Sequence, residues 1–101
     1  MLFELGQVVI TPAAERALIE AGTEADEFLA RHHNGDWGDL DKEDRDENWI
    51  ALDKRYRIIS VYLTSSGSKV WIITERDRST TTILLPEEYP KGVAKIEGGQ
   101  V

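Results

Sequence analysis

The sequence has no cysteine, only three prolines, and no long uninterrupted apolar run. Without thiols, disulfide frameworks, thiol catalysis and thiolate metal sites are all excluded. No apolar segment approaches the roughly 18–20 residues that cross a membrane. The first residues also lack the basic start and apolar stretch of a signal peptide. We therefore expect a soluble, cytoplasmic protein.

Positive charge is scarce as well. Lysine and arginine together number 12 against 19 aspartate and glutamate residues, so the 101-residue chain carries a formal net charge of −7. Broad affinity for nucleic acid needs clustered positive charge, and we do not expect nucleic acid as a partner. Eight of the acidic residues fall between Asp36 and Asp53, which places most of the imbalance in one segment.

The hydrophobic content of 41% is typical of a globular protein. The length fits one domain, which we expect over residues 1–90. Residues 91–101 combine glycine and lysine with isolated apolar residues, and they predict a loosely ordered tail.

Three segments predict helices. Thr11 and Pro12 are typical of a helix start, and Gly22 of a helix end, so residues 12–21 form the first helix. A second apolar stripe predicts a second helix, which ends at the Asn-Gly pair of residues 34–35. Asp41 is suited to cap a third helix, which is strongly acidic and has a narrow apolar stripe.

After the third helix the hydrophobic period changes from helical to alternating. Residues 57–64, 69–74 and 80–85 are rich in β-branched and aromatic residues, and turn-forming residues separate them. A short apolar run at residues 6–10 is a candidate fourth strand. We therefore expect an α+β fold, in which three N-terminal helices pack on one face of a three- or four-stranded antiparallel β-meander.

Two-residue turns would pair Tyr62 with Trp71 and Ile72 with Ile83. The helices would then cover the face that carries Ile72. An apolar and aromatic patch would remain on the opposite face, formed by Ile58, Tyr62, Trp71, Ile73 and Leu84. Such exposed patches mark interaction sites, so this face predicts a homodimer, a higher homo-oligomer or a complex with another protein. The alternative is that the N-terminal strand or the tail covers it.

His32 and His33 are the only histidines. His32 lies on the apolar stripe of the second helix, which favours a structural role near the helix end. The functional alternative is a general base or a metal ligand. Adjacent histidines on a helix point about 100° apart and cannot easily share one ion, and the acidic run lacks the residue spacing of a calcium-binding EF-hand. We expect no metal and no cofactor.

Three arginines at one end of the predicted sheet are candidates for an anion site. Arg57, Arg76 and Arg78 would lie there, with Arg57 opposite Arg76 in the register above. Guanidinium groups bind phosphate and carboxylate in a matched fork. The alternative is that Glu75, Asp77 and the acidic third helix neutralise these arginines in surface salt bridges.

Several motifs, spread over nearly the whole chain, carry a resemblance. They are Leu5-Gly6-Gln7-Val8-Val9, Thr11-Pro12, Gly35-Asp36-Trp37-Gly38, Ile73-Thr74-Glu75, Asp77-Arg78-Ser79, Thr81-Thr82 and Leu84-Leu85-Pro86-Glu87-Glu88-Tyr89. Together they resemble a family of small bacterial proteins called plasmid-related proteins. The resemblance implies a home on plasmids, integron gene cassettes or other mobile elements, and it implies no particular activity.

A second likeness, of architecture and residue type only, is to small toxin ribonucleases such as barnase and the colicins. It implies a set of catalytic candidates: His32 as the base, Arg76 or Arg78 on the phosphate, Thr82 as a positioning hydroxyl, and Tyr89. This is fold-level analogy without a shared diagnostic motif.

Three functions follow as hypotheses. The first is a non-enzymatic homo-oligomeric or partner-binding module of a mobile element, acting through the Tyr62/Trp71 face. The second is a phosphodiester-cleaving toxin that uses the arginine end of the sheet. The third is an acidic mimic of nucleic acid, formed by the helix that follows Asp41.

Overall fold

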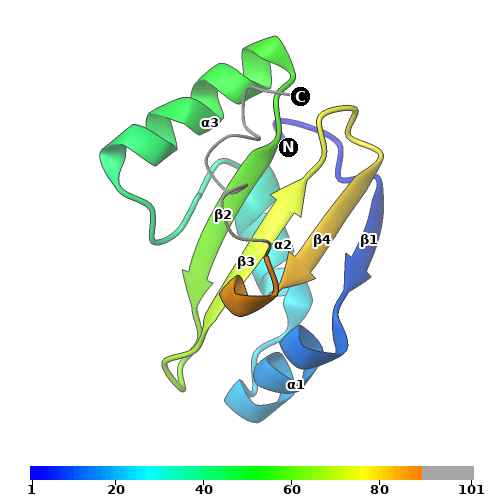
Figure 1. The fold of residues 1–101 in the computed structure, drawn as a ribbon, viewed down its shortest axis with the longest axis vertical. Helices are drawn as coiled ribbons and strands as arrows, with labels where there is room; N and C mark the ends of the chain where they lie inside the picture. Colours follow the sequence, from blue (N-terminus) through cyan, green and yellow to red (C-terminus); the bar gives the residue numbers. More distant parts are fainter. Residues whose placement is uncertain (90–101) are drawn as a thin grey trace.

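The computed structural model describes residues 1–89, so the tail predicted for residues 91–101 lies outside the described residues. The described chain contains three α-helices and a four-stranded sheet (Figure 1). In chain order the elements are β1 (Gln7–Ile10), α1 (Pro12–Ala21), α2 (Ala25–His33), α3 (Lys42–Lys54), β2 (Ile58–Leu63), β3 (Lys69–Thr74), β4 (Thr80–Leu84) and a short 3-10 helix, η1 (Pro86–Glu88).

The helix boundaries follow from local capping. The Thr11 hydroxyl accepts a hydrogen bond from the Ala14 amide at 3.2 Å, and Gly22 ends α1 in the left-handed conformation with φ 66°. The Asp41 carboxylate caps α3 by accepting from the Asp44 amide at 2.9 Å. The starts predicted for these two helices, and the end of the first, are confirmed.

The sheet has the order β1-β4-β3-β2 and is mixed. Strands β2, β3 and β4 form the predicted antiparallel meander, but β1 pairs with β4 in parallel. Gly6 makes this pairing possible. It has φ 66°, and a Cβ at this position would collide with the backbone of Ser79. The expectation of a wholly antiparallel sheet is therefore wrong.

The register of the β2–β3 hairpin differs from the predicted one by a single residue. Tyr62 pairs with Val70, not with Trp71, whereas Ile72 pairs with Ile83 as predicted. The cause is the turn. Thr64 donates its backbone N–H to Ser68 at 2.8 Å, and Gly67 adopts φ 88°, so the loop holds three residues and not two. A one-residue shift turns every β2 side chain to the other face.

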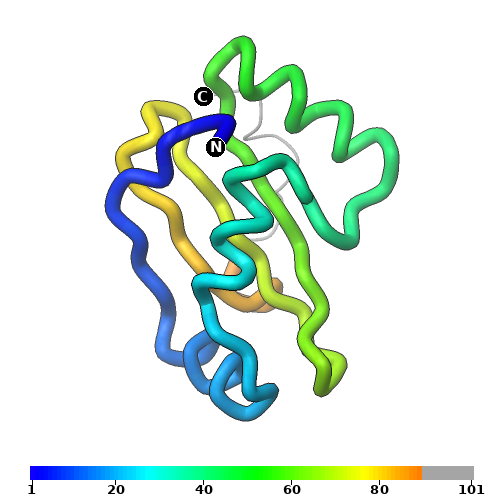
Figure 2. Tube along the Cα trace, turned by 180° about the vertical axis from the view of Figure 1, so that it is seen from behind, coloured from blue at the N-terminus to red at the C-terminus, as the bar shows by residue number. Residues whose placement is uncertain are grey.

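One face of the sheet forms the main core with α1 and α2. Figure 2 shows α2 lying across the sheet, where Phe28 stacks on Tyr62 with ring centroids 4.7 Å apart. Around this pair lie buried residues from the two helices and from β3 and β4, namely Ala14, Leu18, Leu29, Val70, Ile72 and Ile83. Helix α1 sits beside the end of β4, and α3 lies along the edge of β2 (Figure 1), so the three helices do not share one face as predicted.

The outer edge of β2 is closed by hydrogen bonds. The Asn48 side chain of α3 donates to the Ile59 carbonyl at 2.9 Å and accepts from the Ile59 amide at 3.2 Å. Next along the strand, Val61 bonds to the backbone of Trp37 and Asp39. Unpaired edges invite further strands, and here α3 and its preceding loop occupy this one.

A second apolar cluster lies between α3, the loop before it and the N-terminal segment. Its buried members are Phe3, Trp37, Ala51 and Ile58. The N-terminal residues run across the end of the sheet beside the β3–β4 hairpin (Figure 2), because Gln7 donates its amide to Ser79 at 2.9 Å.

Candidate binding site

The predicted interface residues do not share a surface. Ile58 and Tyr62 are 0% and 1% exposed and belong to the core beneath the helices. Trp71, Ile73 and Leu84 lie on the opposite face, because the three-residue loop turned β2 over relative to β3. The prediction of a single Tyr62/Trp71 face is therefore wrong.

The second sheet face is itself partly covered. Ile73 and Leu84 are 3% and 8% exposed, and Trp71 is half-buried with its ring centroid 5.1 Å from that of Tyr89. The Tyr89 hydroxyl in turn accepts a hydrogen bond from Arg57 at 2.9 Å. Little of the predicted apolar patch remains accessible.

His32 is wholly buried between α2 and the sheet and contacts two hydroxyl groups. Its Nδ1 lies 2.6 Å from the Ser60 hydroxyl and its Nε2 lies 2.9 Å from the Thr74 hydroxyl. Thr74 in turn contacts the Thr81 hydroxyl at 2.8 Å, and Thr81 donates to the carbonyl of Leu5 at 2.7 Å.

The Leu5 carbonyl fixes the direction of every proton in this chain, because a carbonyl can only accept. Thr81 uses its proton on Leu5, so Thr74 donates to Thr81. His32 Nε2–H then donates to Thr74, and Nδ1 accepts from Ser60. Burial, followed by the nearby charges, lowers the pKa of His32 to about 3, which matches a neutral ring with one donor and one acceptor.

The other residues of the predicted ribonuclease set lie apart from His32. Thr82 is on the opposite face of the sheet, and Tyr89 follows η1 on that same face. Arg76 is exposed in the β3–β4 hairpin, whereas Arg78 is buried at its base. The structure does not bring these five side chains into one site.

The three arginines of the predicted anion site also separate. Arg57 lies beside Glu75, not Arg76, and their side chains form an ion pair of 3.0 Å. This follows from the same one-residue register shift. The alternative, that Glu75 neutralises Arg57, is confirmed by this ion pair, and Arg78 is one of the residues that line a pocket.

Arg78 is held firmly by backbone carbonyls. Its Nη1 donates to Tyr56 at 2.7 Å and to Glu75 at 3.1 Å, and its Nη2 donates to Ala51 at 3.0 Å. The bonds to Ala51 and Tyr56 anchor Arg78 to the C-terminal end of α3, and the bond to Glu75 holds it within its own turn. A guanidinium has five N–H donors, so two remain for a ligand.

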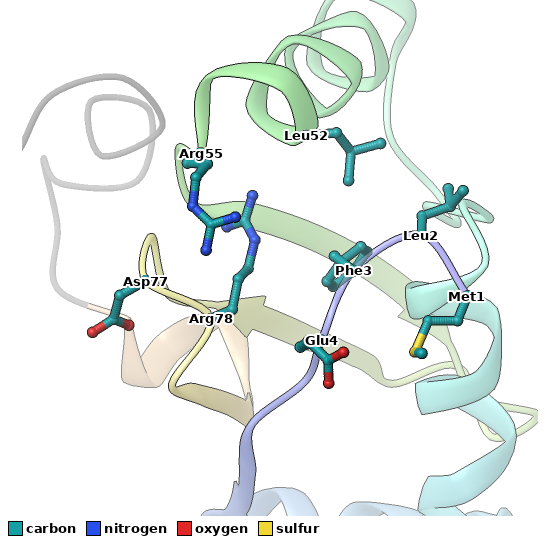
Figure 3. Close-up of a pocket in the computed structure, with 8 residues that line it drawn as sticks. All are labelled: Met1, Leu2, Phe3, Glu4, Leu52, Arg55, Asp77 and Arg78. Carbon is teal, nitrogen blue, oxygen red and sulfur yellow. The ribbon is translucent and has the colours of Figure 1, made fainter.

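Arg78 lines a pocket of about 390 Å³, which we call the N-terminal pocket. Its lining residues are Met1, Leu2, Phe3, Glu4, Leu52, Arg55, Asp77 and Arg78. Figure 3 shows the guanidinium groups of Arg55 and Arg78 side by side at one end, with Phe3, Leu52 and Leu2 at the other. The pocket therefore has a cationic end and an apolar wall.

The two arginines share an unusual backbone conformation. Arg55 and Arg78 both have φ 60°, and they are the only non-glycine residues with positive φ within residues 1–89. Arg55 occupies the C-terminal cap of α3 and Arg78 occupies the β3–β4 turn, two positions where glycine is favoured. Residues held in this region often mark functional sites.

No carboxylate of the described chain pairs with either of these guanidinium groups. The carboxyl groups of Asp77 and Glu4 point away from them in Figure 3. Hydrogen bonds from Ser79 to Asp77 lower the pKa of that carboxyl and hold it in the hairpin. Burial, and then the neighbouring Arg55, lowers the pKa of Arg78.

Sequence reasoning named Arg78 as a candidate for an anion site and placed Arg55 near it, but it did not place the apolar residues of this pocket beside them. The signal at Arg55 was present, since an arginine stands where the end of α3 favours glycine. The contribution of Met1, Leu2 and Phe3 was not visible, because it depends on how the N-terminal segment crosses the sheet.

Within residues 1–89 no group of three or more histidine, aspartate or glutamate side chains is placed to hold a metal ion. In the same part of the chain, no helix is long and apolar enough to span a membrane. Comparisons with protein-family models, with curated proteins and with solved structures find no match. The resemblance to plasmid-related proteins therefore stays a prediction.

Proposed function

We propose that the protein is a non-enzymatic binding module whose partner occupies the N-terminal pocket. The observation that carries this proposal is the pair Arg55 and Arg78, which have no acidic partner in the described chain and lie beside an apolar wall. A concave site in which polar groups converge beside apolar side chains is a common form of ligand site.

The accessible chemistry of the pocket supports binding. Arginine stays protonated at neutral pH and does not act as a general base. The histidine that was the candidate base, His32, is enclosed in the core, where both its nitrogens are engaged by hydroxyl groups. The pocket can hold and orient an anionic partner through its two guanidinium groups.

An aromatic sulfonate dye tests whether this pocket binds. Anilinonaphthalene sulfonate should bind the folded, full-length chain with one-to-one stoichiometry and a rise in fluorescence. Leu2→Asp should weaken this binding about tenfold or more, because it puts a like charge on the apolar wall. Ile50→Asp is the matched control, since Leu2 and Ile50 are 47% and 50% exposed and only Leu2 lines the pocket.

The two variants should have the same circular dichroism as the parent chain, so that the comparison concerns folded protein. Absence of saturable binding by the parent chain would refute the proposal. An equal loss in both variants would refute it too, because the dye would then bind somewhere other than the pocket.

A second candidate, self-association, is supported by the free edge of β1. Gln7 and Thr11 direct their amides to β4, so by alternation Val8 and Ile10 direct their backbone groups outward. No described residue bonds to these outward groups, whereas the β2 edge is closed by Asn48. A second copy could pair its own β1 here and extend the sheet.

Sedimentation over a range of protein concentrations tests this candidate. A dimer that pairs β1 edges should dissociate more readily when Val8→Lys places a charge at the edge. Leu63→Lys, on the exposed part of β2, should leave the equilibrium unchanged. A parent chain that stays monomeric at the highest concentration would remove self-association from consideration.

The hypothesis that the acidic residues along α3 mimic nucleic acid stays a prediction.

A further inference from the structure

The N-terminal pocket has a chemical asymmetry that points to one class of ligand. We propose that it binds an amphipathic monocarboxylate, a molecule with one carboxylate at the end of an apolar chain. The carboxylate lies between Arg55 and Arg78, and the apolar chain lies along Phe3, Leu2 and Leu52. This inference rests on the proposed function, because it names the ligand of the same pocket.

The cationic end is prepared before a ligand arrives. Three hydrogen bonds to carbonyl groups fix the Arg78 guanidinium, and its carbon lies 5.8 Å from the centroid of the Phe3 ring. A donor that is already ordered loses little freedom on binding. Arg55 makes no hydrogen bond and no ion pair within the described chain, so its fork is available to an anion.

The charge around the pocket favours a single negative charge over two. Glu4 and Asp77 also line the pocket, although neither forms an ion pair with the two arginines, and the whole chain carries −7. A phosphate dianion would place two negative charges in these acidic surroundings, whereas a carboxylate places one. The electrostatic repulsion is therefore smaller for the carboxylate. Guanidinium forks match the planar carboxylate in geometry.

The apolar wall explains why the ligand needs a chain as well as a charge. Met1 and Leu2 are exposed large apolar residues, and the buried Phe3 ring forms the base between them and Arg78. Each methylene that a ligand buries against such a wall raises affinity about fourfold. Inorganic anions gain nothing there.

The backbone of the two arginines gives this proposal a distinctive consequence. Glycine at position 55 would adopt the left-handed conformation without the strain that arginine has there. Arg55→Gly should therefore raise the melting temperature, by about 4 °C, while it removes half of the cationic end. A merely structural arginine would show no such opposition between stability and binding.

Calorimetric titration of the full-length chain with octanoate, octanol and inorganic phosphate tests the ligand class. Octanoate should bind one-to-one and at least tenfold more tightly than octanol or phosphate. Hexanoate should bind about sixteenfold more weakly than octanoate, since it loses two methylenes. Arg55→Gly should reduce octanoate affinity at least tenfold and leave octanol affinity unchanged.

Arg76→Gly is the matched control, because Arg76 is an exposed arginine of the neighbouring hairpin that does not line the pocket. It should leave octanoate affinity unchanged. Equal affinities for octanoate and octanol, tighter binding of phosphate, or an unaffected Arg55→Gly variant would each overturn the inference. If the dye still maps to the pocket in those cases, the proposed function stands and only the ligand class falls; if the dye fails as well, both fall.

Discussion

At the scale of single residues, the most informative feature is the buried chain of hydroxyl groups around His32. The Leu5 carbonyl sets the direction of its protons, and every member is satisfied. Satisfied buried networks rigidify a core, and removing one member leaves its neighbours unpaired. This network links α2, the sheet and the N-terminal segment. It therefore helps to hold in place the segment that lines the N-terminal pocket.

Thr81 and Thr82 offer a direct test of that role, because they are neighbours on opposite faces of β4. Thr81→Val should destabilise the fold by about 1–3 kcal/mol, since the Leu5 carbonyl and the Thr74 hydroxyl both lose a partner. Thr82→Val removes a hydroxyl with no hydrogen bond in the described chain and should change stability by less than about 0.5 kcal/mol. Chemical denaturation measures both, and equal effects would contradict the network.

His32 also predicts how stability depends on pH. Its pKa of about 3 in the folded chain lies below the ordinary value of 6.5. Between these two values the unfolded chain binds a proton that the folded chain does not. Stability from this group is therefore complete above pH 6.5 and is lost as the pH falls below it, by about 1.4 kcal/mol per pH unit.

Denaturation between pH 5 and 7 checks this slope before the carboxylates titrate. His32→Gln should flatten it, and His33→Gln should leave it in place. A slope that survives in His32→Gln would mean that another group is responsible.

At the scale of elements, local signals predicted well and the pairing of elements did not. Thr11 with Pro12, Gly22 and Asp41 defined helix ends because capping is a matter of a few adjacent residues. The predicted β2–β3 register was wrong because one additional loop residue, at the turn that contains Gly67, changes the pairing of the entire hairpin. The parallel pairing of β1 with β4 was not predicted, for a related reason. It depends on the close approach of Gly6 to a hairpin more than 70 positions away in the sequence.

Helix α3 carries a prediction of its own, since its Asn48 closes the edge of β2. Asn48→Ala should cost about 2 kcal/mol, because it leaves both the N–H and the carbonyl of Ile59 without a partner. Hydrogen exchange at the Ile59 amide should accelerate along with it. The exposed Glu47→Ala on the same helix should change neither measurement, and unchanged exchange in Asn48→Ala would contradict this assignment.

At the scale of the whole molecule, the net charge of −7 conceals a pocket that has a cationic end. The sequence predicted basic groups at this end of the sheet, with Arg78 among them, and Arg78 lines the pocket. Sequence reasoning could not find the apolar wall, because two long-range contacts bring Met1, Leu2 and Phe3 to the pocket. They are the pairing of β1 with β4 and the hydrogen bond from the Leu2 amide to the His33 carbonyl. Sequence reasoning also placed Tyr62 and Trp71 on one face of the sheet, whereas the three-residue hairpin loop puts them on opposite faces.

The central claim is that the Arg55 and Arg78 pocket is where the protein binds its partner. The most direct measurement is a nuclear magnetic resonance titration of the full-length chain with octanoate, which follows the side-chain Nε–H signals of both arginines and the methyl groups of Leu2 and Leu52. We expect these signals to shift together and to saturate while the Trp71 indole signal stays fixed. Shifts at Trp71 with unmoved arginine signals, or no saturable shift anywhere, would contradict it.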